Sequence, residues 1–257
     1  MTVIRRSIIF TAAQAGLLLV GLVSSIAVSR VLGPDGRGIV ALVSVLIATS
    51  TALATFGFGT SFAYLAGKNV HPLDQIVGNS VVAAFGLGAL TILVLVACSD
   101  LLLGSVLRGM SGLEYEVTLA SVPFAYLAVF QLNFLVGAGE AQRASVMQLC
   151  AGVFAAALIT AALLLGNQGV TGVITTIAVV AVVVALWYLA IVVRMYGISF
   201  AGSGTIGKAA ARFGAKVYLG TISGQFWLRA NVLILNLYAG PSTVGQYSLT
   251  TSLAEKI

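Results

Sequence analysis

One arginine stands in the middle of an otherwise apolar segment. Arg229 lies about twelve residues into the run 217–238. A charged side chain at the centre of a bilayer costs at least about 2.5–3.5 kcal/mol by insertion scales, so it should face a polar cavity or a partner. Gln225, Arg229 and Asn236 are spaced i, i+4 and i+11 and therefore share one helix face, with Asn231 nearby. The pattern predicts anion binding in a central cavity, with a snorkelling or structurally paired arginine as the alternative.

Two further amides lie at membrane depth. Gln14 belongs to the first apolar segment, and Gln131 belongs to the fourth, close to Asn133. Such side chains more often join helices than bind a substrate. We expect helix–helix hydrogen bonds from each and keep substrate contact as the alternative.

The sequence lacks the parts of a metal centre or a hydrolytic site. His71 is the only histidine, and it lies in a loop before Pro72. No paired carboxylates share a helix face, so no metal, cofactor or catalytic residue is predicted. Cys98 and Cys150 lie in apolar runs and are expected to be free, buried side chains.

Residues 202–208 have the spacing of a phosphate-binding loop, Gly-x4-Gly-Lys. Ala209 stands where that motif needs a hydroxyl for Mg²⁺, and a membrane span rather than a strand precedes it. We expect a flexible basic linker here.

The elements that position these residues are membrane helices. Of 257 residues, 60% are hydrophobic and 8% charged, against about 25% charged in soluble domains. The composition excludes both a soluble enzyme and a disordered chain, and a mean hydropathy of +1.09 indicates an all-α polytopic membrane protein. The predicted spans are 7–29, 39–66, 76–103, 117–138, 144–165, 170–193, 217–238 and a last helix beginning near Thr243.

These spans define three expected parts of the chain. They are a six-helix bundle at 1–197, a basic cytoplasmic linker at 198–216, and the start of a second bundle at 217–257. Gly57 and Gly59 predict a break in the second span. Eight basic residues lie on the side of the N-terminus and three on the other, so we expect a cytoplasmic N-terminus. The net charge of +6 then indicates contact with anionic lipid headgroups rather than nucleic acid.

The chain contains an internal repeat. The junction from Gly33 to Gly38 and the junction from Gly240 to Gly245 both read Gly-Pro-x-x-x-Gly, each followed by a leucine four residues later. All matched positions are 207 residues apart, and both motifs precede a helix. A unit of six helices predicts parallel repeats about an axis along the membrane normal. Two full copies need roughly twice this offset, so we expect the chain to hold only part of the second copy, as a fragment or a truncated product.

The junction sequences resemble those of a known family. Val28–Gly38, with Arg30 and Arg37, and the segment from Leu235 to Glu255 are similar to the helix 1–2 and helix 7–8 junctions of polysaccharide-biosynthesis flippases, the O-antigen-type exporters of the multidrug/oligosaccharidyl-lipid/polysaccharide superfamily. Gly137–Glu140 fits this family loosely. The resemblance implies two helix bundles around a cavity in the bacterial inner membrane. It also implies transport, without catalysis, of an undecaprenyl-diphosphate-linked sugar, alongside the polysaccharide assembly machinery.

The resemblance also implies roles for particular residues. Arg229 would bind the diphosphate near the midplane, and Arg30 and Arg37 would meet it at the outer mouth. Many members carry an acid shortly after the helix 7 arginine, where this chain has Asn231, which puts ion coupling through that site in doubt. A related exporter of drugs or lipids, and a membrane polymerase or ligase, are the alternatives.

Overall fold

The computed structural model describes residues 2–165 and 169–254, and every regular element in that part of the chain is a helix. Five helices are long and apolar enough to cross a membrane, which agrees with the predicted all-α polytopic membrane fold. The helices are α1 (Thr2–Ala54), α2 (Phe58–Lys68), α3 (Leu73–Ala97), α4 (Ser99–Gly104), α5 (Gly112–Gly137), α6 (Ala141–Leu165), α7 (Gly169–Tyr196) and α8 (Ser203–Ala254).

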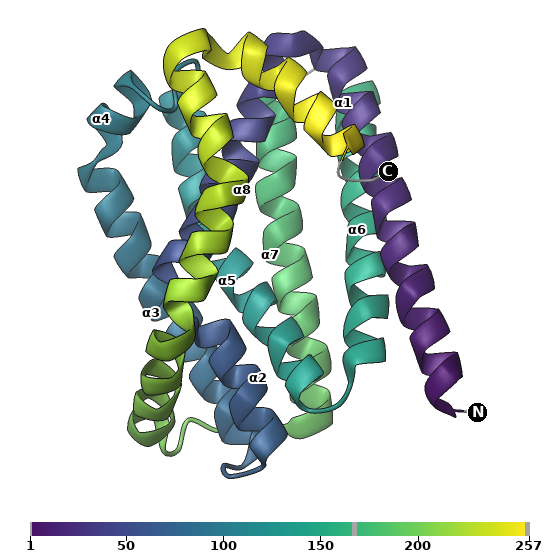
Figure 1. Ribbon diagram of the computed structural model, residues 1–257, viewed down its shortest axis with the longest axis vertical. Helices are drawn as coiled ribbons and strands as arrows, with labels where there is room; N and C mark the ends of the chain where they lie inside the picture. Colours follow the sequence, from purple (N-terminus) through teal and green to yellow (C-terminus); the bar gives the residue numbers. More distant parts are fainter. Residues whose placement is uncertain (1, 166–168, 255–257) are drawn as a thin grey trace.

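Two of these helices are each a pair of helices joined by a kink. In α1 the kink is at Gly33 (φ 69°, ψ −175°), and in α8 it is at Gly240 (φ 79°, ψ 176°). A positive φ of this kind is accessible to glycine and strained for other residues. The two kinks lie at the same end of the molecule, where α1 and α8 each turn sideways before their second half (Figure 1).

The two kinked junctions pack directly against each other. A Cβ added to Gly38 would overlap the carbonyl oxygen of Pro241, and one added to Gly245 would overlap that of Pro34. Pro34 and Gly38 become Pro241 and Gly245 under the offset of 207 residues. Each contact is therefore the counterpart of the other, as in the self-complementary contact around a twofold axis. The shared backbone conformation and this reciprocal contact support the repeat inferred from the sequence.

The second predicted span is interrupted, as its glycines indicated. Helix α1 ends at Ala54, and α2 begins only at Phe58. Phe56 (φ 45°) and Gly57 (φ 72°) have left-handed backbone between them. A Cβ at Gly57 would press on the backbone of Gly214 in α8, so the break also lets α8 approach closely.

The predicted flexible linker is wrong over most of its length. Helix α8 begins at Ser203, so residues 203–216 are helical. Ile206, Ala210 and Gly214 are buried at a spacing of four residues, and they turn this first part of α8 into an amphipathic helix packed on the bundle. The division of the chain at 197 and 217 stays a prediction.

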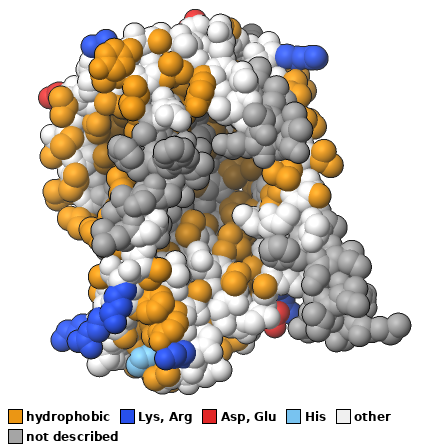
Figure 2. Space-filling model, in the orientation of Figure 1, with side chains coloured by type: hydrophobic (Ala, Val, Ile, Leu, Met, Phe, Trp, Pro, Cys, Tyr) orange, Lys and Arg blue, Asp and Glu red, His pale blue; other side chains and the backbone are white. Residues whose placement is uncertain are grey.

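The largest buried cluster draws most of its residues from the first bundle and also includes Ile206 and Ala210 of α8. Buried aromatic side chains from α2 and α5, including Phe62, Tyr126, Phe130 and Phe134, pack with residues of α3, α6 and α7. Leucine, valine and phenylalanine side chains remain exposed along several of the predicted spans. Figure 2 shows these apolar side chains over the middle of one face, with charged side chains toward its two ends. This is the distribution expected of a surface that faces lipid.

Candidate functional site

The face of α8 that the sequence predicts to be polar is turned toward the first bundle. This holds for the positions on that face whose side chains are described. Tyr218, Leu233 and Asn236 fall on the same helix face as positions 225 and 229 by the 3.6-residue period. The Tyr218 hydroxyl donates a hydrogen bond to the Leu53 carbonyl of α1 over 2.5 Å. The side chains of Gln225 and Arg229 lie outside the described residues, although their backbone belongs to α8.

Asn236 has a local structural role. Its side chain is 1% exposed, and its amide nitrogen donates to the carbonyls of Val106 (2.7 Å) and Arg108 (3.4 Å). These carbonyls belong to the loop between α4 and α5, so the amide holds that loop against α8. Its Oδ1 has no hydrogen-bond partner among the described residues. Asn231 is exposed, and its register on α8 sets it on the opposite face from Asn236, so the two amides are not brought together.

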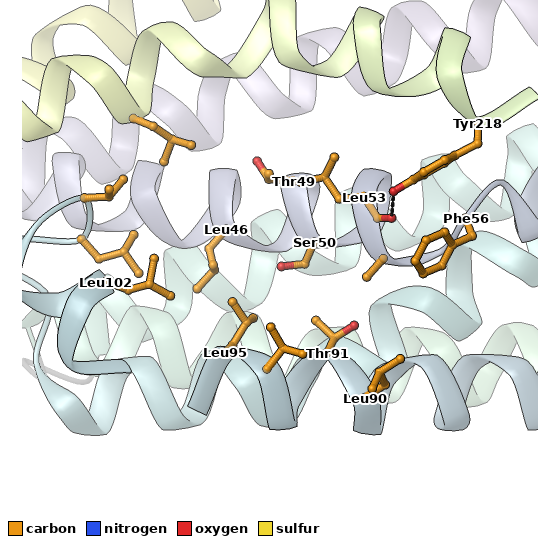
Figure 3. Close-up of a pocket in the computed structure, with 15 residues that line it drawn as sticks. Leu46, Thr49, Ser50, Leu53, Phe56, Leu90, Thr91, Leu95, Leu102 and Tyr218 are labelled. Atoms are coloured by element: carbon orange, nitrogen blue, oxygen red, sulfur yellow. Dashed lines mark hydrogen bonds between the residues drawn. The ribbon is translucent and has the colours of Figure 1, made fainter. Parts of the chain in front are cut away.

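An apolar cavity lies beside this face of α8 (Figure 3). It measures about 440 Å³ and is bounded by the end of α1, by α3 and α4, and by Tyr218 and Leu233 of α8. Its few polar atoms come from Thr49, Ser50 and Thr91, and the Thr49 hydroxyl has no partner. Since Leu233 lies one turn after position 229, this cavity adjoins the part of α8 where the sequence predicts the anion site.

A second cavity lies within the first bundle and has a different chemistry. It measures about 430 Å³ and is lined by both halves of α1, by α6 and by α7. Arg37 lines it together with the hydroxyl side chains of Ser24, Ser25 and Ser44. The apolar and the Arg37 cavities share no lining residue.

The two arginines of the first junction have separate surroundings. Arg30 is exposed, before the kink. Arg37 follows the kink and lines the second cavity, where its Nε atom is buried and has no hydrogen-bond partner. The expected role of both residues at the outer mouth stays a prediction. Sequence reasoning missed the serines, whose only signal was their hydroxyl groups at membrane depth near this junction.

The remaining predicted amides lie away from both cavities. Gln131 is fully buried, and its amide donates to the Ser80 hydroxyl over 2.9 Å, which joins α5 to α3. This agrees with the expected helix–helix contact. Gln14 is half-buried in the first part of α1. Neither glutamine lines the apolar or the Arg37 cavity.

Residues that could hold a metal do not gather in the part of the chain that the structure describes. Cys98 and Cys150 are free, as expected, but both are exposed rather than buried. Cys98 separates α3 from α4, and Cys150 lies on α6. The Gly202–Lys208 motif forms the turn that begins α8, with the Thr205 hydroxyl bonded to the Gly202 carbonyl.

A family model described as polysaccharide biosynthesis protein matches residues 3–257. The chain belongs to this family. No curated protein matches this chain.

Several solved structures share the fold of this chain at low sequence identity. One described only as protein A has a TM-score of 0.73 at 19% identity and covers 98% of this chain and 60% of its own. A second, the outward-facing conformation of a multidrug resistance MATE family transporter of the MOP superfamily, has a TM-score of 0.67 at 18% identity, with 98% and 64% covered.

A third similar structure is a MOP superfamily transporter from Pyrococcus furiosus, reported with a binding pocket of reverse polarity that suggests a different function. It has a TM-score of 0.67 at 18% identity, and 98% of this chain and 63% of that chain are covered. The chain thus spans about three fifths of the length of these structures, and the likeness concerns the fold.

Proposed function

We propose that this chain is part of an exporter that moves a lipid-linked oligosaccharide across the bacterial plasma membrane, without catalysing a chemical step. The substrate is a polyprenyl diphosphate carrying a sugar chain, and the partners are the bilayer and the polysaccharide assembly machinery. The N-terminus lies in the cytoplasm. Membership in the polysaccharide biosynthesis family supports a role in surface polysaccharide formation.

The observation that carries the proposal is the orientation of α8. Tyr218 and Asn236 make hydrogen bonds to the first bundle from the helix face that includes positions 225 and 229. Position 229 belongs to that face by helical register, and in this proposal its arginine meets the substrate there. A guanidinium with neighbouring amides suits an anionic, hydroxyl-rich headgroup, because charge-assisted hydrogen bonds to phosphate are strong and directional.

The adjoining apolar cavity suits the same substrate. A prenyl diphosphate has an anionic end and a hydrocarbon end, and the cavity of about 440 Å³ beside α8 is lined almost wholly by apolar side chains. Leu53, Phe56, Leu90 and Val94 line it and are also exposed at the surface of the bundle, so a lipid chain has access. Transport then follows from rocking of one repeat against the other.

A multidrug exporter is the second candidate, since similar folds belong to multidrug transporters. A carrier of organic cations needs a carboxylate at its binding site. Among the residues whose side chains are described, no Asp or Glu lines either cavity, and Arg37 is the charged residue that lines one of them. The lining therefore favours an anionic substrate.

The proposal is tested by Arg229→Ala in cells that depend on the protein for surface polysaccharide. We expect export to be abolished while membrane insertion and protein level stay normal, because the headgroup loses its charged ligand. Arg212→Ala is the matched control, since Arg212 is an exposed arginine on the same helix, and it should export normally. Normal export by Arg229→Ala, measured as surface polysaccharide, would reject the role of Arg229.

A further inference from the structure

The cavity around Arg37 points to a second binding site. We propose that it binds a phosphate-type oxyanion through the Arg37 guanidinium and the Ser25 hydroxyl, inside the first bundle. The ligand is either free inorganic phosphate or the phosphate of a lipid headgroup. This inference rests on the cavity itself and does not require the proposed function.

The first observation is that two buried donors have no partner. The Nε atom of Arg37 and the Oγ atom of Ser25 are both shielded from solvent, and neither makes a hydrogen bond within the described structure. A buried polar group without a partner costs about 1–3 kcal/mol, and more when it is charged. Both residues line the same cavity, so one ligand that accepts hydrogen bonds could satisfy both donors.

The second observation is that the positive charge has no counter-ion. The one ion pair found in the described part of the chain joins Arg143 to Glu140, at the other end of the bundle from the kink. The described residues that line the cavity include no Asp or Glu. An arginine within a membrane helix is normally paired, so a half-buried guanidinium without an ion-pair partner among the described residues, facing a cavity that opens to the surface, suits an anionic ligand.

The third observation concerns shape and donor type. The cavity of about 430 Å³ is large enough for a phosphate with bound water, and its polar lining consists of the guanidinium and three serine hydroxyls. Ser44 already donates to the Val40 carbonyl, which leaves Ser24 and Ser25 as hydroxyl donors. A guanidinium fork with neighbouring hydroxyls matches the tetrahedral oxygens of phosphate.

The fold keeps this site in place. Gly33 turns the chain back so that Arg37, after the kink, lies across from the first half of α1, which carries Ser24 and Ser25. Gly36 packs against Val170 at the start of α7, and a Cβ there would come within 2.9 Å of that side chain. The arginine is thus held on a short, tightly packed turn rather than on a mobile loop.

The test measures phosphate binding to the purified protein in nanodiscs made of a zwitterionic lipid. Inorganic phosphate is titrated by equilibrium dialysis against the wild type, Arg37→Met and Arg30→Met. We expect saturable binding to the wild type, at least about tenfold weaker binding to Arg37→Met, and an affinity within twofold of wild type for Arg30→Met, because Arg30 is an exposed arginine of the same junction. Equal binding by the wild type and Arg37→Met would overturn the site.

A second arm replaces phosphate with farnesyl diphosphate and identifies the source of the ligand. Competition between the two probes at one Arg37-dependent site assigns it to phosphate groups in general. Arg37-dependent binding of the prenyl diphosphate alone assigns it to a lipid headgroup. If neither probe binds in a way that depends on Arg37, the proposal is wrong.

Thermal unfolding separates ligand binding from folding. Phosphate should raise the Tm of the wild type and of Arg30→Met but not that of Arg37→Met. Should Arg37→Met fail to fold, Ser25→Ala and Arg37→Lys replace it, and unchanged phosphate affinity in both would reject the site. In an Arg229→Ala background, the part of phosphate binding that depends on Arg37 should remain, so loss of export and loss of this site give different results.

Discussion

The Asn236 side chain joins α8 to a loop that lies about 130 residues earlier in the chain. Its amide nitrogen donates to the Val106 and Arg108 carbonyls. We predict that Asn236→Leu lowers the free energy of unfolding by about 1–3 kcal/mol, because the two loop carbonyls lose the donor that the buried Asn236 side chain supplies. Asn231→Leu, at an exposed position of the same helix, should change it by less than about 0.5 kcal/mol. Chemical denaturation in detergent measures both, and equal stability of the two variants would contradict this role.

The same residue shows what the sequence could and could not predict. The spacing of Asn236 from Arg229 correctly gave a shared helix face, because helical period alone decides it. Its partners could not be predicted, since they are main-chain carbonyls of a distant loop. The role of Arg37 at an outer mouth stays a prediction, whereas the cavity that this residue lines could not be predicted, because it depends on the left-handed turn at Gly33.

The crossing of the two kinked junctions depends on glycine at two positions. We predict that Gly38→Ala destabilises the protein by about 1–3 kcal/mol, because its Cβ overlaps the Pro241 carbonyl and the junctions must separate. Gly245→Ala should cost a similar amount, since its contact with Pro34 is the counterpart. Gly86→Ala is the control: no atom lies near its Cβ, so alanine should be neutral or stabilise α3 by up to about 1 kcal/mol. Thermal unfolding compares the three, and a stable Gly38→Ala would argue against the close contact.

At the level of helices, apolar runs predicted the spans, and local signals fixed their ends. Ser111 and Glu114 form a capping box that starts α5 at Gly112, five residues before the predicted start, and this Ser-x-x-Glu signal was present in the sequence. The buried spacing of Ile206, Ala210 and Gly214 was also there, but glycine and basic residues around it favoured a linker. Long-range packing against α2 and α3 decides that segment in favour of helix.

The whole molecule has one arrangement across a membrane, which labelling can test. After Cys98 and Cys150 are replaced by alanine, single cysteines are introduced at His71 and at Arg108. His71 belongs to the loop between α2 and α3 and Arg108 to the loop between α4 and α5, and these two loops lie at opposite ends of the bundle (Figure 1). With the N-terminus in the cytoplasm, we predict that a membrane-impermeant thiol reagent labels Arg108→Cys in intact cells, and labels His71→Cys only after the membrane is opened. The reverse pattern would invert the proposed orientation.

The crossed junctions constrain how the two halves of this sequence can diverge. Pro34 meets Gly245 and Gly38 meets Pro241, so a larger residue in either copy collides with the other copy rather than with its own. After a duplication, residues that face different surroundings in the two copies can change independently. Residues of one copy that contact the equivalent residues of the other copy cannot. This agrees with the match between the halves that falls at the Gly-Pro turns.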